Sequence, residues 1–281
     1  MNSRSWFRGT ALLLGMLFLY LPILLMIAGS FNNSRLVTVW DAANSPTLKW
    51  YVELYHNDQI KHAAWLSIKV AFITGCGAVV LGTIAGLVMA RFGPFRGRAL
   101  LSGMTTAPLV MPEVITGLAM LIMFVALEQL VGWPKGRGLV TIAIAHITFA
   151  MSYVTIVVQS RLASFDDSLE EAALDLGARP AKVFFRVTLP LILPAIVSGW
   201  LLAFTLSWDD VVISQFVSGP GSSTLPVVIF SKVRLGVTPS INALATIMVM
   251  IVATGVVLSV LLMRHLEHKR ALESQMANAD R

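Results

Sequence analysis

The sequence contains little charge and almost no cysteine. Only 13% of its 281 residues are charged, against about 25% in soluble domains, whereas 56% are hydrophobic and the mean hydropathy is +0.77. This composition excludes a disordered chain, a coiled coil and a typical soluble enzyme. The single cysteine, Cys76, excludes a disulfide framework and a metal site built from several cysteines. The composition is that of a membrane protein.

The sequence motifs of common hydrolytic enzymes are also absent. The chain has no G-x-x-x-x-G-K-[ST] phosphate-binding loop, so we do not expect it to hydrolyse ATP by that route. It has no H-E-x-x-H or G-x-S-x-G pattern, and none of its five histidines has a convincing metal-ligand partner. His146, in the middle of an apolar run, is expected to be a hydrogen-bonded packing residue. We expect no catalytic residue, metal or cofactor in this chain.

Long uncharged runs predict six membrane-crossing helices, because a helix needs about 20 mostly apolar residues to cross the hydrocarbon core. The runs are 10–29, 70–90, 99–127 (interrupted only by Glu113), 139–160, 187–208 and 235–263. A further uncharged run, 211–231, is broken by glycine and proline. Because such backbone is unstable against lipid, we interpret it as an external loop that dips back against the protein.

The positions of the basic residues predict the orientation of the chain. Most of its 21 Lys and Arg residues fall in the segments 1–9, 91–98, 161–186 and 264–281, and cytoplasmic loops are rich in these residues. Both termini are therefore expected in the cytoplasm, and the net charge of +6 needs no nucleic-acid partner. The first outer loop, 31–62, is expected to contain a short interfacial helix around its Trp and Tyr residues.

The predicted cytoplasmic loop 161–190 is the most informative polar segment. Ser168 and Glu171 have the spacing of a capping box, which starts a helix. Gly177 is suited to the left-handed end of that helix, and Pro180 to the first position of a second one. The loop is therefore predicted to be a compact helix–turn–helix. On these residues alone, a docking element and a well-capped connection are equally good interpretations.

The loop also carries a recognisable pattern, which consists of Glu171, Ala172, Ala173, Gly177, Val187, Leu189 and Pro190. It resembles the EAA signature of permease subunits in type I binding-protein-dependent ABC importers, with Val187 in place of the usual Ile. The resemblance implies an all-α permease core over residues 63–264, preceded by a transmembrane helix and outer loop (1–62) and followed by a cytoplasmic tail (265–281). It also implies that the first helix of the loop docks in a groove of an ATP-binding subunit.

Five other stretches point to a narrower group: 30–34, 107–117, 204–210, 216–221 and 241–245. They resemble the polyamine permeases of putrescine and spermidine importers. The resemblance implies a bacterial inner-membrane subunit, not an enzyme, that moves putrescine or another polyamine by alternating access. The implied partners are a second, related permease, a periplasmic substrate-binding protein, and two ATP-binding subunits that hold ATP and Mg²⁺.

Four ionisable residues lie within or beside the predicted spans: Lys69, Glu113, Asp209 and Asp210. A charge in the bilayer is costly, so such residues face protein or water and are candidates for function. Carboxylates beside Trp208 suit a polyammonium cargo, through ion pairing and cation–π contact. Glu113, Trp208, Asp209 and Asp210 are therefore the candidate substrate path. The structural alternatives are that the aspartates cap a helix or pair with Lys69, and that Glu113 hydrogen-bonds free backbone near Pro108 and Pro112, which are expected to break the third span.

Two other classes of function stay open on the sequence. One is a secondary transporter of a small cation, driven by an ion gradient, with Glu113 or Asp210 as its proton or cation site. The other is a membrane anchor without a pathway, which leaves the acidic residues and broken spans unexplained. The organised loop favours the ATP-driven importer. Gly82 and Gly86 form a small-xxx-small pair, for which we expect ordinary packing within the chain.

Overall fold

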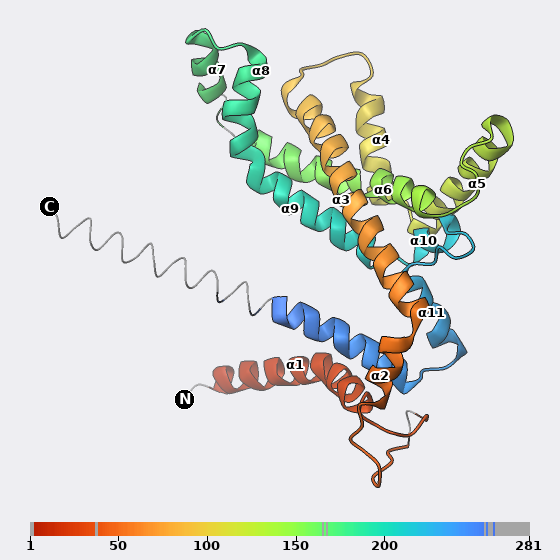
Figure 1. The fold of residues 1–281 in the computed structure, drawn as a ribbon. Coiled ribbons are helices and arrows are strands. Elements are labelled where there is room, and N and C mark those ends of the chain that lie inside the picture. Colours follow the sequence, from red (N-terminus) through yellow and green to blue (C-terminus); the bar gives the residue numbers. More distant parts are fainter. Residues whose placement is uncertain are drawn as a thin grey trace. The chain divides into compact units, whose positions relative to one another are not determined.

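The computed structural model describes residues 3–36, 39–164, 166, 168–255, 257 and 261, and in these ranges the regular structure is entirely helical (Figure 1). This confirms the all-α prediction. Among the described residues, five helices are long and apolar enough to cross a membrane: Trp6–Gly29, Asp58–Arg91, Glu113–Val131, Leu139–Ala163 and Pro180–Trp208. The predicted tail, 265–281, lies outside the described residues. The chain divides into two compact units, Met1–Asp58 with Lys232–Arg281, and Gln59–Ser231.

The first unit contains α1 (Ser3–Gly29), α2 (Lys49–His56) and a shorter apolar helix, Pro239–Gly255. Large hydrophobic side chains are exposed all along α1, as expected of a helix that faces lipid on every side. A Cβ atom on Gly29 would lie 3.0 Å from Nδ2 of Asn242, so the end of α1 packs closely against the helix Pro239–Gly255. The helix α2 confirms the short helix predicted in the loop 31–62.

Two of the stretches that resemble polyamine permeases, 30–34 and 241–245, lie where the end of α1 meets its neighbours in this unit. In the stretch 30–34, the buried Asn32 accepts a hydrogen bond at its carbonyl from Nε1 of Trp50 (2.6 Å), and its Oδ1 atom accepts the N–H of Asp41 (3.0 Å). The hydroxyls of Ser30 and Tyr51 lie 2.6 Å apart. The stretch 241–245 supplies the contact with Gly29. Both stretches therefore hold helices together, which is a structural role.

The second unit is built around α6 (Leu139–Ala163), which packs against α3 (Asp58–Arg91) and α9 (Leu189–Trp208) (Figure 1). Its remaining elements are α4 (Arg98–Val110), α5 (Glu113–Val131), α7 (Ser168–Asp175), α8 (Pro180–Val183), η1 (Phe184–Thr188), α10 (Val212–Val217) and the part of α11 (Leu225–Leu235) up to Ser231. Apolar side chains of α6, including Ile142, Ala145, Val154 and Val158, are fully buried and form two core clusters.

Small residues bring the backbones of α3 and α6 into close contact. A Cβ atom on Gly82 would lie 2.7 Å from the Cβ of Val154 and 2.9 Å from the carbonyl oxygen of Met151. One on Gly86 would lie 3.1 Å from the side chain of Val158. Such distances leave no room for a side chain. The two glycines therefore serve packing within the chain, as predicted.

The third predicted span, 99–127, is broken beside its prolines, as the sequence indicated. It is divided between α4 and α5, because the backbone is extended at Met111 (ψ 136°) and Pro112 (ψ 135°). Proline disfavours the helical conformation at the preceding residue and lacks the N–H that would continue the helix. Only the second part, Glu113–Val131, is long enough to cross a membrane. Glu113, which was predicted inside the span, is therefore its first residue.

Three other predicted boundaries differ from the structure. The fifth span begins at Pro180 instead of residue 187, because α8, η1 and α9 follow one another without a break. The sixth, 235–263, is described only in part, as the shorter helix Pro239–Gly255, and the rest includes residues outside those described. The segment 211–231, predicted as a loop, contains α10 and part of α11.

Candidate functional sites: a charged loop and a carboxylate cluster

The end of α7 explains the glycine of the loop signature. Gly177 has a φ of +81°, and its N–H donates to the carbonyl of Leu174 (2.9 Å), while the N–H of Ala178 donates to that of Ala173 (3.1 Å). These two bonds form a Schellman motif, which requires a left-handed residue at this position. Pro180 then occupies the first turn of α8. The predicted helix–turn–helix, with its left-handed glycine and its proline start, is confirmed.

The start of α7 differs from the predicted capping box. The helix begins at Ser168, and the Ser168 N–H donates to Oδ1 of Asp166 (3.0 Å). This backbone hydrogen bond holds the pKa of Asp166 below its ordinary value of 3.8. Ser168 thus receives a cap from Asp166 instead of pairing with Glu171, whose side chain is exposed.

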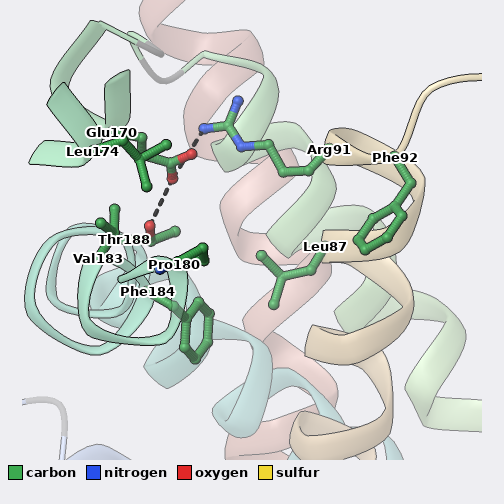
Figure 2. A pocket seen from close by; sticks show the side chains of 9 residues that line it. All are labelled: Leu87, Arg91, Phe92, Glu170, Leu174, Pro180, Val183, Phe184 and Thr188. Carbon is green, nitrogen blue, oxygen red and sulfur yellow. Dashed lines mark hydrogen bonds and ion pairs between the residues drawn. The ribbon is translucent and has the colours of Figure 1, made fainter. Parts of the chain in front are cut away.

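Glu170, which the sequence analysis did not single out, makes the contacts of the first turn instead. Its Oε1 atom accepts a hydrogen bond from the Thr188 hydroxyl (2.6 Å) and lies 3.4 Å from Nη2 of Arg91 (Figure 2). The side chains of Glu170 and Arg91 are each 21% exposed, and Thr188 is 4% exposed. One carboxylate oxygen therefore joins α7 to the last residue of α3 and the last residue of η1.

A cavity of about 390 Å³ lies beside this carboxylate (Figure 2). Its lining is mostly apolar, and comes from α3 and the residue after it on one side and from α7, α8 and η1 on the other: Leu87, Arg91, Phe92, Glu170, Leu174, Pro180, Val183, Phe184 and Thr188. No described residue of α7 is fully buried. The loop helix is thus held to the unit by few contacts.

The last two residues of the signature begin α9. Leu189 packs against the core cluster of α6 and α9, and its N–H donates to the carbonyl of Phe184, five residues earlier. Pro190 follows, and has no N–H to contribute to a regular α-helical turn. The π-helical turn η1 therefore carries the chain from α8 into α9 at the point where proline interrupts the regular bonding.

The opposite surface of α7 faces outward. Glu171 and Ala172 are exposed, and so are two leucines of the helix and its end: Leu169 (50%) and Leu176 (88%). Exposed leucines on a short helix are typical of a surface that another protein covers. Glu171, Ala172 and Gly177 thus lie on a projecting helix, whereas Leu189 and Pro190 lie at the base from which it projects.

At the other end of α9, Asp210 belongs to a buried hydrogen-bonded network. Its Oδ2 atom accepts the N–H of Ser214 (2.7 Å) and lies 3.1 Å from Nε2 of His146, and its Oδ1 atom accepts the N–H of Ile213 (3.2 Å). The other ring nitrogen of His146 lies 2.7 Å from the Ser207 hydroxyl. The side chains of His146 and Asp210 are 2% and 8% exposed. The network thus joins α6, α9 and the start of α10.

This network shows the contacts of two residues for which the sequence left alternatives open. Asp210 caps α10, as the structural alternative had it, and His146 is a hydrogen-bonded packing residue, as expected. The Nζ atom of Lys69 lies 5.2 Å from the centre of the Trp65 ring, and no described contact joins Lys69 to an aspartate.

Glu113 and Asp209 are the exposed members of the candidate substrate path. Both side chains are exposed, and the charge of Glu113 interacts with those of Asp209 and Asp210. The break before α5 and the end of α9 thus bring three carboxylates into one region, although the positions are about 100 residues apart. Carboxylates that repel one another favour a cation between them.

An aromatic column on α9 leads to these carboxylates. The rings of Phe204 and Trp208 are stacked with centroids 6.2 Å apart, and those of Trp200 and Phe204 with centroids 5.3 Å apart. The three residues are four positions apart, so they lie on one face of the helix. Phe72 of α3 meets Trp200 edge-on. Trp208 is among the site residues predicted from the sequence, whereas Phe204 and Trp200 are not, although their spacing of four residues could have revealed them.

The loop helices α7 and α8 lie at one end of the apolar rod Pro180–Trp208 (Figure 1), and Asp209 and Asp210 directly follow its other end. This rod has 29 residues, which at 1.5 Å per residue corresponds to about 43 Å. That length exceeds the roughly 30 Å of a hydrocarbon core. The rod is therefore long enough to put the two candidate sites on opposite sides of a membrane.

Comparison with known proteins gives consistent similarities. The family described as binding-protein-dependent transport system inner membrane component matches residues 82–271. The putrescine transport system permease protein PotI of Escherichia coli K12 is 52% identical over 98% of this chain and 96% of its own length. The spermidine/putrescine transport system permease protein PotC of Haemophilus influenzae is 39% identical over 95% of this chain and 100% of its own length.

Solved structures resemble the chain at the level of the fold. A chain of a bacterial ABC transporter that imports the acidic polysaccharide alginate has a TM-score of 0.69 and 18% identity, and the match covers 92% of this chain and 98% of that one. A chain of the MetNI methionine ABC transporter has a TM-score of 0.57 and 18% identity over 69% and 88% of the two chains. At this identity the likeness concerns the fold alone.

Proposed function

The chain belongs to the family of binding-protein-dependent transport system inner membrane components, and from this premise we propose that it is the permease subunit of an ATP-driven importer of putrescine or another polyamine. The observation that carries the cargo assignment is the similarity to the PotI permease, which is 52% identical over 98% of the chain. Relatives named for putrescine and for spermidine both align over nearly all of the chain.

The carboxylate cluster supports a polyamine as the cargo. A diamine carries an ammonium group at each end and an aliphatic stem between them. Glu113 and Asp209 offer exposed carboxylates for an ammonium group, and the neighbouring Trp208 offers a ring face for cation–π contact. The column of Phe204 and Trp200 extends this surface along α9. Asp210 holds the adjoining backbone in place by accepting the N–H groups of Ile213 and Ser214.

The loop supports an ATP-binding partner. Glu171, Ala172 and the exposed leucines form the outward surface of α7, and the Schellman turn at Gly177 fixes the shape of its end. In the proposed assembly, this helix docks in an ATP-binding subunit, which supplies ATP and Mg²⁺. The complete importer contains two such subunits, a second related permease and a periplasmic substrate-binding protein. This chain then has no catalytic residue, metal or cofactor of its own.

The proposed topology has six spans with both termini in the cytoplasm of a bacterial inner membrane. The five long apolar helices account for five crossings, and the helix Pro239–Gly255 starts the sixth. The rod Pro180–Trp208 connects the ATP-dependent event at α7 with the carboxylates at its far end. Alternating access results when the two ends of the rod favour different conformations in the ATP-bound and ATP-free complexes.

Uptake measurements test the cargo. The complete importer, reconstituted in liposomes with ATP inside, is assayed with labelled putrescine. Glu113→Gln and Asp209→Asn should each lower uptake about tenfold, since loss of roughly 1.4 kcal/mol of ion pairing corresponds to that factor. Glu53→Gln, which removes an exposed carboxylate from α2, is the matched control and should leave uptake unchanged. Full uptake by the double variant of Glu113 and Asp209 would refute their role.

The energy source is tested separately. Glu171→Lys reverses the charge on the exposed surface of α7 and should uncouple ATP hydrolysis from transport, whereas Glu53→Lys should not. Coupling that survives Glu171→Lys would contradict the docking assignment. Uptake that collapses with an ionophore while ATP persists would instead support an ion-driven secondary transporter.

A further inference from the structure

The attachment of α7 to its own unit depends on very few contacts. No residue of α7 is fully buried, and a cavity of about 390 Å³ separates parts of its inner side from α3. Leu174, which lines this cavity, is still 45% exposed. Apolar packing therefore fixes the orientation of this helix only weakly, because a cavity wall lacks the van der Waals contacts of a filled core.

The Glu170 carboxylate supplies the directional contact that the packing lacks. Its Oε1 atom accepts the Thr188 hydroxyl at 2.6 Å and lies 3.4 Å from Nη2 of Arg91 (Figure 2). Thr188 is buried, and the Glu170 and Arg91 side chains are largely buried, so these interactions are screened less than surface ion pairs. Bonds to charged groups are also stronger than neutral ones.

The two partners of Glu170 lie at points where a helix ends or changes direction. Arg91 is the last residue of α3, and Thr188 is the last residue of the π-helical turn that leads into α9. A π-turn contains one more residue than an α-turn, so it changes the direction in which the following side chains point. Rotation of α7 relative to either helix must therefore stretch or break a bond to Glu170.

We propose that Glu170 is the positioning residue that couples movement of α7 to α3 and to the start of α9. Glu170 faces inward and holds α7 to its own chain, whereas the adjacent Glu171 faces outward. Of the two neighbouring carboxylates, Glu170 thus attaches α7 to its own chain, and Glu171 belongs to the surface that faces the partner. This inference rests on the proposed function only where it concerns ATP-driven transport.

A cross-linking experiment tests the attachment without ATP or partners. In a Cys76→Ala background, Leu87→Cys on α3 and Leu174→Cys on α7 place one thiol on each side of the cavity. A short bifunctional thiol reagent should link them in the full-length chain in membranes. Glu170→Gln keeps an acceptor for Thr188 but removes the charge opposite Arg91, and should lower the yield about fivefold, the lower end of typical coupling between sites.

Two controls make the cross-linking result specific. Glu171→Gln, the exposed neighbour, should not change the yield. Thr188→Val removes the hydroxyl at nearly constant volume, and should lower the yield even if Glu170→Gln fails to accumulate. An unchanged yield in both Glu170→Gln and Thr188→Val would overturn the proposal.

The assembled importer provides the second readout. With Glu170→Gln, the putrescine transported per ATP hydrolysed should fall about fivefold or more, while the same amount of ATP-binding subunit co-purifies. Loss of co-purification instead would overturn the division of roles, because Glu170 would then belong to the partner surface. The charge swap of Glu170→Arg with Arg91→Glu should recover part of the transport ratio. If the wild-type complex shows no ATP-dependent uptake, the proposed function fails while the cross-linking still decides the attachment.

Discussion

The close contact between α3 and α6 makes Gly82→Ala a quantitative test of the fold. The added Cβ would lie 2.7 Å from the Cβ of Val154 and 2.9 Å from the Met151 carbonyl oxygen. Neither neighbour can turn away, because one is a backbone atom and the other is attached directly to the backbone of a fully buried residue. The helices must therefore separate locally. Overpacking of this kind costs about 1–3 kcal/mol, and we expect the upper part of that range.

Alanine at two other glycines should cost successively less stability. At Gly77 an added Cβ meets the Cδ1 atom of Ile147 at 2.6 Å, but that atom is the tip of a flexible side chain and can move. At Gly103, in α4, nothing lies within 4 Å. Gly77→Ala should therefore cost less than Gly82→Ala, and Gly103→Ala should be neutral or stabilise by up to about 1 kcal/mol through helix propensity.

The assay is the thermal unfolding midpoint of the purified chain in mild detergent at one fixed scan rate. With a change of about 2–4 °C per kcal/mol for a chain of this size, Gly82→Ala should lower the midpoint by about 5–10 °C. Gly77→Ala should fall between Gly82→Ala and the wild type, and Gly103→Ala should not lie below the wild type. Equal midpoints for Gly82→Ala and Gly103→Ala would refute the close contact of α3 with α6.

Three further predictions follow from the sites. Asp210→Ala leaves a buried histidine and two backbone amides without their acceptor and should cost about 3–5 kcal/mol, whereas the exposed Asp209→Ala should change the same midpoint little. Gly177→Ala puts a Cβ on a residue with a φ of +81° and should cost about 1–2 kcal/mol locally, lowering co-purification of the ATP-binding subunit. The cap of Asp166 on Ser168 should persist at neutral pH and weaken only in acid, as the pH falls through the lowered pKa of Asp166. Hydrogen exchange of the first-turn amides of α7 measures this weakening.

Features that depend only on neighbouring residues could be predicted from the sequence alone. An uncharged run predicts a span because length and hydropathy are local, and Gly177 and Pro180 predict their turn because backbone conformation depends on the residue itself. The break at Pro112 belongs to this class, and the prolines of the third span predicted it, because proline restricts the residue before it and lacks an N–H.

Which side chains meet, in contrast, depends on how the helices pack in three dimensions. Arg91 and Glu170 are 79 positions apart, and His146 and Asp210 are 64 positions apart. No local preference links such pairs, because they are brought together by the packing of α3, α6 and α9 around one core. For the same reason, the sequence could not tell which of Glu170 and Glu171 faces inward, since that depends on the direction in which α7 leaves α6.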